Sequence, residues 1–458
     1  MPGRSIKASG KVFRDPVHRL IRIDPDDAFI LELIDTPEFQ RLRRIRQLGV
    51  SSMTYHGAEH SRFAHSLGVF QFCQRILEAL ERRYRRDATL SDYFKSRGKL
   101  VRAAALLHDI GHGPYSHMIE RAFDDGLHHE LRTCRLIADS KGGIAPILNE
   151  AGIAPEEVVG IIDKTSQHRL LVDIVSSQLD ADRMDYLLRD SLQTGVEYGK
   201  YDAEWLLNAM CVGRDPSRTG APRPEDLRLC LDHRRGNDVA EQFILARVHM
   251  HNQVYMHRVT RGYEVLLLNT FRHARDLLQR MELTGTPPVV ASFFANAKDV
   301  NRDVWLSLDE SAMHMALHAW TGESSPETLR ELSRAFLNRH RVFASWDVVN
   351  PKPRALLDAE GSFSKAGLSK GLDWEFDDGS VLPYRGLLTP KPGGGLEERL
   401  AHSILLSEGE SNSVAQPIEQ NSPLFRMLGE KATPITRLYV LRAKVSAAES
   451  VLQTLGIS

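Results

Sequence analysis

Apolar side chains recur every three or four positions through most of the first 280 residues, a spacing that is typical of amphipathic helices. The pattern predicts helices over 61–84, 99–110, 170–191 and 238–270. On the first of these helices His65 shares the apolar stripe, where an imidazole needs a polar partner. This part of the chain is therefore expected to fold as a helical core.

The pattern changes toward the C-terminus. A short strand is predicted at 227–232, a helix at 326–339 and a further strand at 436–445. Glycine, proline and aspartate accumulate over 350–396, which indicates loops with a few short strands. The C-terminal part should therefore combine helices with small sheets.

These patterns predict a mainly α protein in two parts. Residues 1–275 would form the helical core. Residues 276–458 would form a smaller mixed α/β region, with oligomerisation or regulation as its candidate role.

The composition argues against several classes of protein. The 59 basic and 60 acidic residues give a formal net charge of −1, which disfavours a charge-driven nucleic-acid binder but leaves local basic patches open. The four cysteines are far apart and form no CxxC pair, which argues against a disulfide scaffold and a zinc ribbon. No run approaches the roughly 18–20 apolar residues that cross a bilayer, and the first residues lack the apolar region of a secretion signal. We expect a cytoplasmic protein with no membrane partner.

Histidines carry the candidate chemistry, since nine of the 19 fall between residues 56 and 168. His108 and Asp109 end an apolar helix just before a glycine turn, and imidazole plus carboxylate suits Mn, Fe, Zn or Co. The alternative is a core histidine beside a solvated terminal charge. Because His65 and Asp182 also lie on apolar helix faces, three helices could supply four ligands to one ion and leave a position for water.

Six segments strengthen this reading by their order and spacing. Together they resemble the HD-domain deoxynucleoside triphosphate triphosphohydrolases of the SAM-and-HD-domain type, in a bacterial form without the SAM domain. The resemblance spans roughly residues 11–275 and rests on the segments Asp15–His18, Asp35–Arg43, Gln47–Gly49, His60–Val69, His108–His117 and Asp180–Tyr186.

The resemblance implies a metal-dependent hydrolase with an HD-domain helical core. A metal-activated water would attack the α-phosphorus of a deoxynucleoside triphosphate and release deoxynucleoside and triphosphate. The implied ligands are His65, His108, Asp109 and Asp182, and they would hold Mn, Fe, Mg or Zn, with a second ion as an option.

The resemblance also places four residues around the scissile phosphate: His112, His117, Glu120 and His129. We expect His117 to protonate the departing 5′-oxygen, oriented by Glu120 and helped by His129, because a nearby carboxylate fixes the tautomer of an imidazole. The family more often has aspartate at the position of Glu120. The alternative is that His128 and His129 are exposed loop residues.

The implied substrate residues come from several helices. Arg62, Arg183 and Arg247 would bind the triphosphate, and Leu48 would lie against the base or sugar. Tyr186 would pack under the deoxyribose and reject a 2′-hydroxyl. Gln47 and Asp190 would bind the 3′-hydroxyl. His251 and Tyr255 would contact the phosphates and the sugar. The alternative for Arg247, His251 and Tyr255, spaced by four, is an ordinary helix stripe.

The sequence leaves more than one hypothesis open for regulation and for the class of function. Asp35, Gln40 and Arg43 match an activator-nucleotide site. The alternative is that Arg43, together with Arg41, Arg44 and Arg46, forms a solvated basic helix face, which could bind single-stranded nucleic acid. Relatives of this kind imply a homo-oligomer, a dimer or a tetramer. The alternatives to a triphosphohydrolase are an HD-type phosphohydrolase or phosphodiesterase on another nucleotide or on nucleic-acid ends, and a non-catalytic nucleotide-sensing module. The intact ligand set argues against the last.

Overall fold

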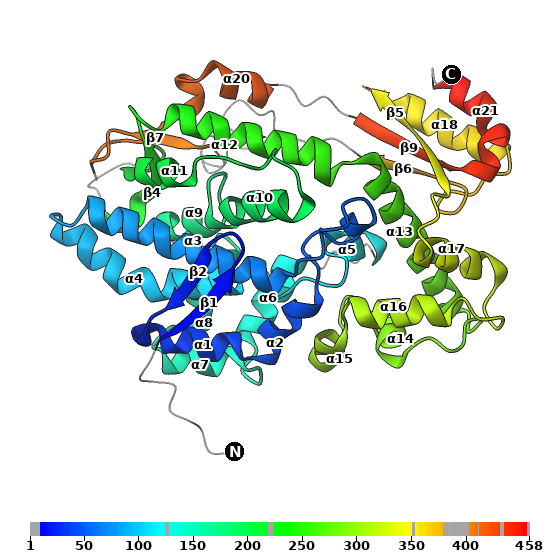
Figure 1. Cartoon of the computed structure of the whole chain (residues 1–458), viewed down its shortest axis with the longest axis horizontal. Helices are drawn as coiled ribbons and strands as arrows, with labels where there is room; N and C mark the ends of the chain where they lie inside the picture. Colours follow the sequence, from blue (N-terminus) through cyan, green and yellow to red (C-terminus); the bar gives the residue numbers. More distant parts are fainter. Residues whose placement is uncertain are drawn as a thin grey trace.

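The computed structural model describes residues 10–123, 128–218, 223–349, 353–378, 384, 403–410, 412–430 and 435–455. Helices dominate these residues, so the predicted mainly α class is confirmed (Figure 1). The helices up to residue 279 are α1 (Ala28–Ile34), α2 (Pro37–Gln40), α3 (Arg62–Arg83), α4 (Ala88–Leu107), α5 (His117–Phe123), α6 (His129–Ala138), α7 (Ile144–Glu150), α8 (Pro155–Ile162), α9 (Arg169–Val175), α10 (Ala181–Thr194), α11 (Ala203–Ala209), α12 (Asn237–Met250) and α13 (Arg258–Gln279). The later helices are α14 (Pro288–Ala295), α15 (Arg302–Ser307), α16 (Glu310–Ala319), α17 (Glu327–Leu337), α18 (Pro353–Lys365), α20 (Pro423–Glu430) and α21 (Val445–Thr454).

Two of the predicted helices are placed close to where the pattern puts them. Helix α3 agrees with the prediction for 61–84, and α17 agrees with the prediction for 326–339. The segment 99–110 is only the second half of α4, because Asp87 caps that helix by accepting the backbone N–H of Leu90 at 3.1 Å. The apolar pattern detects the buried half of α4 and misses its start.

The two other predicted helices are broken by side-chain caps. The predicted helix 170–191 is α9 and α10, and Asp180 begins α10 by accepting the Arg183 N–H at 2.7 Å. The predicted helix 238–270 is α12, a π-helical turn at His251–Tyr255 and α13, which begins where the His257 ring accepts the N–H of Val259. Both predictions of one continuous helix were wrong, because hydrophobic periodicity does not register caps.

Three small sheets accompany the helices. The strands are β1 (Lys11–Asp15), β2 (Arg19–Ile23), β3 (Met210–Arg214), β4 (Leu227–Asp232), β5 (Phe343–Val349), β6 (Trp374–Asp378), β7 (Leu405–Ser407), β8 (Gln416–Pro417) and β9 (Ile435–Leu441). They form a β1–β2 hairpin, a sheet of order β3-β4-β7-β8 and a sheet of order β5-β9-β6. The strand predicted at 227–232 is confirmed as β4, and the strand predicted at 436–445 is β9 followed by a helical turn and α21.

The segment 350–396 differs from the prediction of loops and short strands. Pro353–Lys365 forms helix α18, since a proline is well tolerated in the first turn of a helix. Strand β6 at Trp374–Asp378 agrees with the prediction. The glycine- and proline-rich run 390–395 lies outside the described residues.

Two hydrophobic cores hold these elements together. The main core extends from Ile21 to Tyr439 and includes α14 to α17, which continue the helical part beyond α13. A second core joins α18, α21 and the β5-β9-β6 sheet around Phe363 and Trp374. The predicted boundary at residue 275 falls inside α13. The division into 1–275 and 276–458 therefore stays a proposal. Because the second core begins only with the β5-β9-β6 sheet, the packing of the two cores favours a boundary closer to β5.

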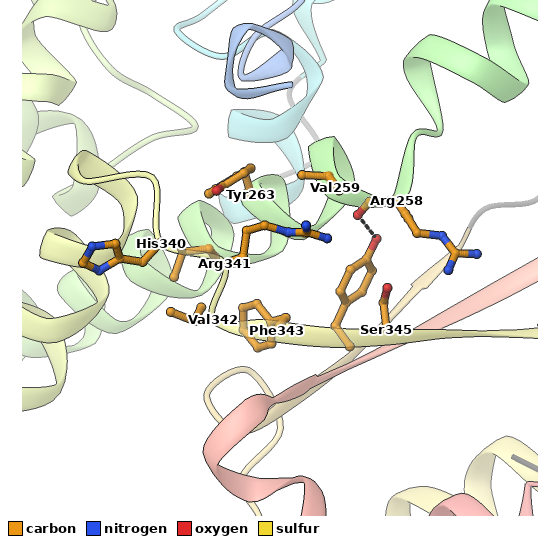
Figure 2. Close-up of a pocket in the computed structure, with 11 residues that line it drawn as sticks. Arg258, Val259, Tyr263, His340, Arg341, Val342, Phe343 and Ser345 are labelled. Atoms are coloured by element: carbon orange, nitrogen blue, oxygen red, sulfur yellow. Dashed lines mark hydrogen bonds between the residues drawn. The ribbon is translucent and has the colours of Figure 1, made fainter. Parts of the chain in front are cut away.

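A small cavity of about 30 Å³ lies where α13 meets β5 and β9 (Figure 2). Figure 2 shows Arg258 and Arg341 among the residues that line it, and the hydroxyl of Tyr439 donates to the carbonyl of Arg258 at 2.9 Å. A cavity of this size has room for a water molecule but not for a nucleotide. We therefore assign it to the packing of the C-terminal sheet on the helical core.

Across the described part of the chain, none of the helices combines the length and the apolar character that a bilayer crossing requires.

Candidate active site

Three helices deliver the predicted metal ligands to one place. His65 comes from α3, His108 and Asp109 follow the end of α4, and Asp182 lies in the first turn of α10. The Nε2 atom of His65 is 3.0 Å from Asp182 Oδ1 and 3.7 Å from Asp109 Oδ2. The Nε2 atom of His108 is 3.3 Å from Asp109 Oδ1 and 3.7 Å from Asp182 Oδ1. The donor atoms of His65, His108 and Asp182 lie within 4.8 Å of one another, so they could share one ion.

The two histidines are oriented as metal ligands require. The Nδ1 atom of His65 donates to Asp185 Oδ2 at 2.9 Å, and the Nδ1 atom of His108 donates to the carbonyl of Ala105 at 2.9 Å. Both Nε2 atoms are buried, and within the described chain neither has a hydrogen-bond partner of suitable geometry. Two Nε2 lone pairs facing two carboxylates fit a divalent metal ion, and the second hydrogen bond of each ring fixes the tautomer that presents Nε2.

A second cluster lies directly beside this set. His112 is in the turn after α4, His117 and Glu120 are in α5, and His129 begins α6. The rings of His112 and His129 stack at a centroid distance of 3.8 Å, and the ring of His117 is about 5 Å from both. The Nε2 atom of His112 lies 3.3 Å from Asp109 Oδ1, which joins the two clusters. The four side chains predicted around the scissile phosphate thus form one cluster, which His112 connects to the candidate metal ligands.

Glu120 organises the second cluster. Its Oε1 accepts hydrogen bonds from Nδ1 of His129 at 2.9 Å and from the backbone N–H of His129 at 3.0 Å. Its Oε2 is 3.7 Å from Nδ1 of His117. Burial alone would raise the pKa of Glu120, but the nearby rings of His117 and His129 outweigh it and hold the pKa well below its usual range. Glu120 is therefore a carboxylate that can orient both rings.

The histidines of this cluster differ in exposure. The side chain of His112 is 2% exposed, whereas that of His117 is 66% exposed. Burial, followed by the nearby charges of Arg62 and His129, lowers the pKa of His112 well below its usual range, so this ring is neutral. His117 is the member that can reach a ligand arriving from solvent. The alternative that His128 and His129 are exposed loop residues agrees with His128, which is exposed. It does not agree with His129, whose ring is packed against His112.

The three predicted phosphate-binding arginines lie near the metal ligands but have protein partners. Arg62 is buried and donates to Asp109 Oδ2 at 2.5 Å and to Ser116 Oγ at 2.9 Å. Arg183 pairs with Asp180 at the start of α10. The guanidinium of Arg247 donates to Gln178 Oε1 at 2.6 Å. An incoming phosphate would have to share or replace these partners.

The residues predicted for the sugar pocket form a connected group. The hydroxyl of Tyr255 donates to Asp190 Oδ2 at 2.8 Å, and its ring lies 6.1 Å from that of Tyr186 and 5.7 Å from that of His251. Burial, followed by the charge of Arg247, lowers the pKa of His251 to about 4. Gln47 is buried, and its Oε1 has no hydrogen-bond partner among the residues described here.

Leu48 and the stripe of Arg247, His251 and Tyr255 complete the set of predicted substrate residues. Leu48 is half-buried and packs against the main core. The stripe of Arg247, His251 and Tyr255 crosses from α12 into the π-helical turn, so the three residues are not on one regular helix as predicted. Tyr255 still reaches Asp190 from the end of that turn.

The candidate activator residues lie at the ends of α1 and α2. Asp35 ends α1 and is exposed, and Gln40 Oε1 accepts the Nε hydrogen of Arg43 at 2.9 Å. Arg43 also lies over the ring of Phe63 at 3.6 Å. The alternative of a solvated basic face fits Arg43 but not Arg41, whose side chain is 1% exposed.

Sequence reasoning missed several residues that hold the site. Nε2 of His18 lies 2.8 Å from Asp185 Oδ1, so Asp185 connects the β1–β2 hairpin to His65. Nε2 of His60 lies 2.8 Å from Asp190 Oδ1 and completes the sugar-pocket group. All three positions are in the segments that carry the family resemblance, which was the available signal.

Comparison with known proteins places the site in a family context. A family model described as HD domain matches residues 62–190, which include all four predicted metal ligands. The uncharacterized protein YwfO of Bacillus subtilis is 35% identical over 413 residues, which cover 89% of this chain and 87% of that protein. The human deoxynucleoside triphosphate triphosphohydrolase SAMHD1 is 28% identical over 307 residues, which cover 60% of this chain and 46% of that enzyme. The matched region thus spans about half the length of SAMHD1.

Two solved structures have a similar fold over nearly the whole chain. A phosphohydrolase from Bacteroides thetaiotaomicron has a TM-score of 0.72 and 26% identity, covering 95% of this chain and 100% of that one. A hypothetical protein from Aquifex aeolicus has a TM-score of 0.67 at 25% identity and covers 97% of this chain. The similarity therefore extends beyond the residues matched by the family model and includes the C-terminal part.

Proposed function

This chain belongs to the HD-domain family, in its deoxynucleoside triphosphate triphosphohydrolase type, and we propose that it hydrolyses deoxynucleoside triphosphates to deoxynucleoside and triphosphate. The broader activity, metal-dependent phosphohydrolysis, follows from the family. The nucleotide and the bond that is cleaved are the proposal. It is supported most by the contact between two clusters, a set of metal ligands and an exposed histidine beside a carboxylate, which meet at Asp109.

The proposed chemistry divides between these clusters. A divalent ion held by His65, His108, Asp109 and Asp182 supplies Lewis acidity and an activated water when bound. Mn, Fe, Mg and Zn all suit these donors, so the ion stays open.

His117 would protonate the departing 5′-oxygen; its exposure and its position beside the anionic Glu120 support this role. His129 accompanies it, since its Nδ1 donates to the same carboxylate, and His112 remains neutral between the clusters.

The substrate class is supported by the residues around the metal ligands. Arg62, Arg183 and Arg247 would neutralise the triphosphate, which gains negative charge as the bond breaks. Tyr186 would lie under the deoxyribose, and Gln47 and Asp190 would bind the 3′-hydroxyl. Asp190 accepts bonds at both oxygens already, but a carboxylate has four lone pairs and can accept a further donor.

Several finer points belong to the same proposal. We expect a homo-oligomer, a dimer or a tetramer, in the cytoplasm, with an activator nucleotide at Asp35, Gln40 and Arg43. The competing functions are phosphohydrolysis or phosphodiester cleavage on another nucleotide or on nucleic-acid ends, and nucleotide sensing without catalysis.

The test is a product analysis of the purified full chain. The protein is incubated with Mn and each dNTP and NTP, with and without GTP, and the products are resolved by chromatography. Release of triphosphate from dNTPs is the expected result. Release of diphosphate or monophosphate alone would overturn the proposed substrate and leave the family assignment intact.

A further inference from the structure

Three segments that are far apart in the sequence meet beneath the active site. They are the segment 41–47, the turn 112–116 before α5, and the segment 305–310 that joins α15 to α16. The guanidinium of Arg41 donates to the carbonyl of Leu308 at 3.0 and 2.8 Å and to the carbonyl of His112 at 2.6 Å. Trp305 lies against the same guanidinium at 4.7 Å. A buried arginine thus ties all three segments at one point.

Glu310 ties them at a second point. Its Oε1 accepts the backbone N–H of Tyr115 at 2.9 Å and the backbone N–H of Arg46 at 3.1 Å. The residue is 6% exposed. Tyr115 is two residues before His117, and Arg46 is next to Gln47. One carboxylate oxygen therefore links the turn that leads to the catalytic histidine with the loop that leads to a substrate residue.

The turn that Glu310 holds is strained. Tyr115 and Ser116 have φ values of 59° and 54°, a conformation that residues other than glycine adopt at a cost and keep only when their surroundings hold them. Ser116 Oγ donates to the carbonyl of Arg46 at 3.1 Å, which closes the same junction from the other side. At Gly49, a side chain would meet the carbonyl of Tyr115 at 3.2 Å. The turn and the 46–49 loop are thus packed too closely to move independently.

We propose that Glu310 is a positioning residue that sets the place of His117 relative to the metal ligands by holding Tyr115 and Arg46 on one oxygen. This inference rests on the proposed role of His117. Glu310 lies outside the matched HD domain, in the C-terminal region for which the sequence suggested oligomerisation or regulation rather than a part in the active site. It does not contact substrate itself and acts through the backbone.

Three substitutions test the role. Glu310→Gln keeps an Oε1 that can accept both N–H groups, Glu310→Ala removes it, and Glu310→Asp shortens the side chain so that it cannot reach both. Burial raises the pKa of Glu310 to about 7, so the neutral amide is a close match. Glu419→Ala is the control, because Glu419 is also buried and accepts bonds from Tyr384 and Ser403 away from this junction.

The first measurement is amide hydrogen exchange of the metal-free full chain. We expect Glu310→Ala to speed exchange at Tyr115 and Arg46 at least tenfold and Glu310→Gln to leave it at the wild-type rate. Glu419→Ala should leave both amides unchanged. If Glu310→Ala does not fold, Glu310→Asp replaces it, with faster exchange expected at one amide or both. If Tyr115 and Arg46 exchange at the wild-type rate in every folded Glu310 variant, the proposal is overturned. It is also overturned if Glu419→Ala speeds exchange at these two amides as much as Glu310→Ala does.

The second measurement is the steady-state rate with bound metal. Glu310→Ala should lower kcat at least tenfold while KM and metal content stay near wild type, and Glu310→Gln should restore kcat. A loss confined to KM, or no recovery in Glu310→Gln, would contradict positioning of His117. Because exchange is measured without substrate, an inactive wild-type protein would overturn the proposed function but not the exchange result.

Discussion

His65 donates its Nδ1 hydrogen to Asp185 across 2.9 Å, which leaves Nε2 of the same ring directed at Asp182 and Asp109. The other oxygen of Asp185 lies 2.8 Å from Nε2 of His18, and the guanidinium of Arg189 also binds this carboxylate. Asp185 is fully buried, so these donors are what keep it charged. The orientation of His65, a proposed metal ligand, therefore depends on the β1–β2 hairpin.

Substitution of Asp185 should weaken metal binding without touching a ligand. In Asp185→Asn one acceptor oxygen becomes an NH₂ group that cannot accept from His65 or His18, so the His65 ring is no longer fixed. Metal affinity should fall about 10- to 100-fold, as measured by competition with a chelating dye. Asp226→Asn is the control, because Asp226 is buried and paired with Arg223 elsewhere. Equal metal affinity in wild type and Asp185→Asn would contradict this role.

Substitution of Gly68 tests the role of Asp185 in metal binding without changing Asp185 itself. A side chain at this position would come within 1.9 Å of Asp185 Oδ1 and 2.4 Å of the Arg189 guanidinium. Gly68→Ala should therefore displace Asp185 and lower metal affinity in the same direction. The same dye competition measures the effect, and circular dichroism checks that α3 remains helical. A folded Gly68→Ala protein with wild-type affinity would mean that the position of Asp185 does not control the site.

The two clusters can be separated by metal content. Asp182→Ala removes a donor from the His65 and His108 set, so both bound metal and turnover should be lost. Glu120→Ala should lower turnover and leave the metal content of the first set unchanged, since Glu120 serves the histidines of the second cluster. Metal per chain is measured by atomic emission after gel filtration. A fall from two ions to one in Glu120→Ala would instead assign a second ion to His112, His117, Glu120 and His129.

The grouping of the candidate metal ligands could be predicted because these residues carry local signals. His65 on an apolar stripe and Asp182 near a helix start both require partners, and the His108–Asp109 pair ends a helix at a glycine turn. The helices themselves were predictable where burial sets the period, as in α3. Their ends were not, because Asp180 caps α10 through a single side-chain bond that leaves no trace in the apolar pattern.

The supports of the site could not be predicted because they are tertiary. Glu310 binds two backbone N–H groups that lie 195 and 264 residues away in the sequence, and a backbone N–H has no residue type to recognise. Arg41 looked like one member of a basic helix face, yet its guanidinium is buried against two carbonyl oxygens. The pairs His18–Asp185 and His60–Asp190 likewise join the β1–β2 turn and the loop before α3 to α10, which is more than 100 residues away in the sequence.

Removal of the Tyr255 hydroxyl should weaken the proposed sugar pocket. In Tyr255→Phe, Asp190 loses one of its two neighbours and is no longer fixed at Oδ2. A hydrogen bond to a charged group contributes about 1.5–3 kcal/mol, so kcat/KM for dNTPs should fall at least about tenfold. Tyr198→Phe is the control, because Tyr198 is exposed on the surface. An unchanged kcat/KM in Tyr255→Phe would exclude Asp190 from substrate binding.

Glu310 should also give the protein a measurable pH dependence of stability. Burial raises its pKa to about 7 in the folded chain, whereas an unfolded glutamate titrates near 4.5. The folded state therefore binds the proton more tightly, so this contribution is complete below pH 4.5 and is lost as the pH rises to about 7. Arg41, whose charge acts on Glu310, stays protonated in this range because burial lowers its pKa only to about 9. Between pH 5 and pH 8 the free energy of unfolding of the wild type should fall by about 2–3 kcal/mol more than that of Glu310→Gln. Urea unfolding of both proteins at the two pH values measures this difference, and equal pH dependence would mean that Glu310 is ionised throughout.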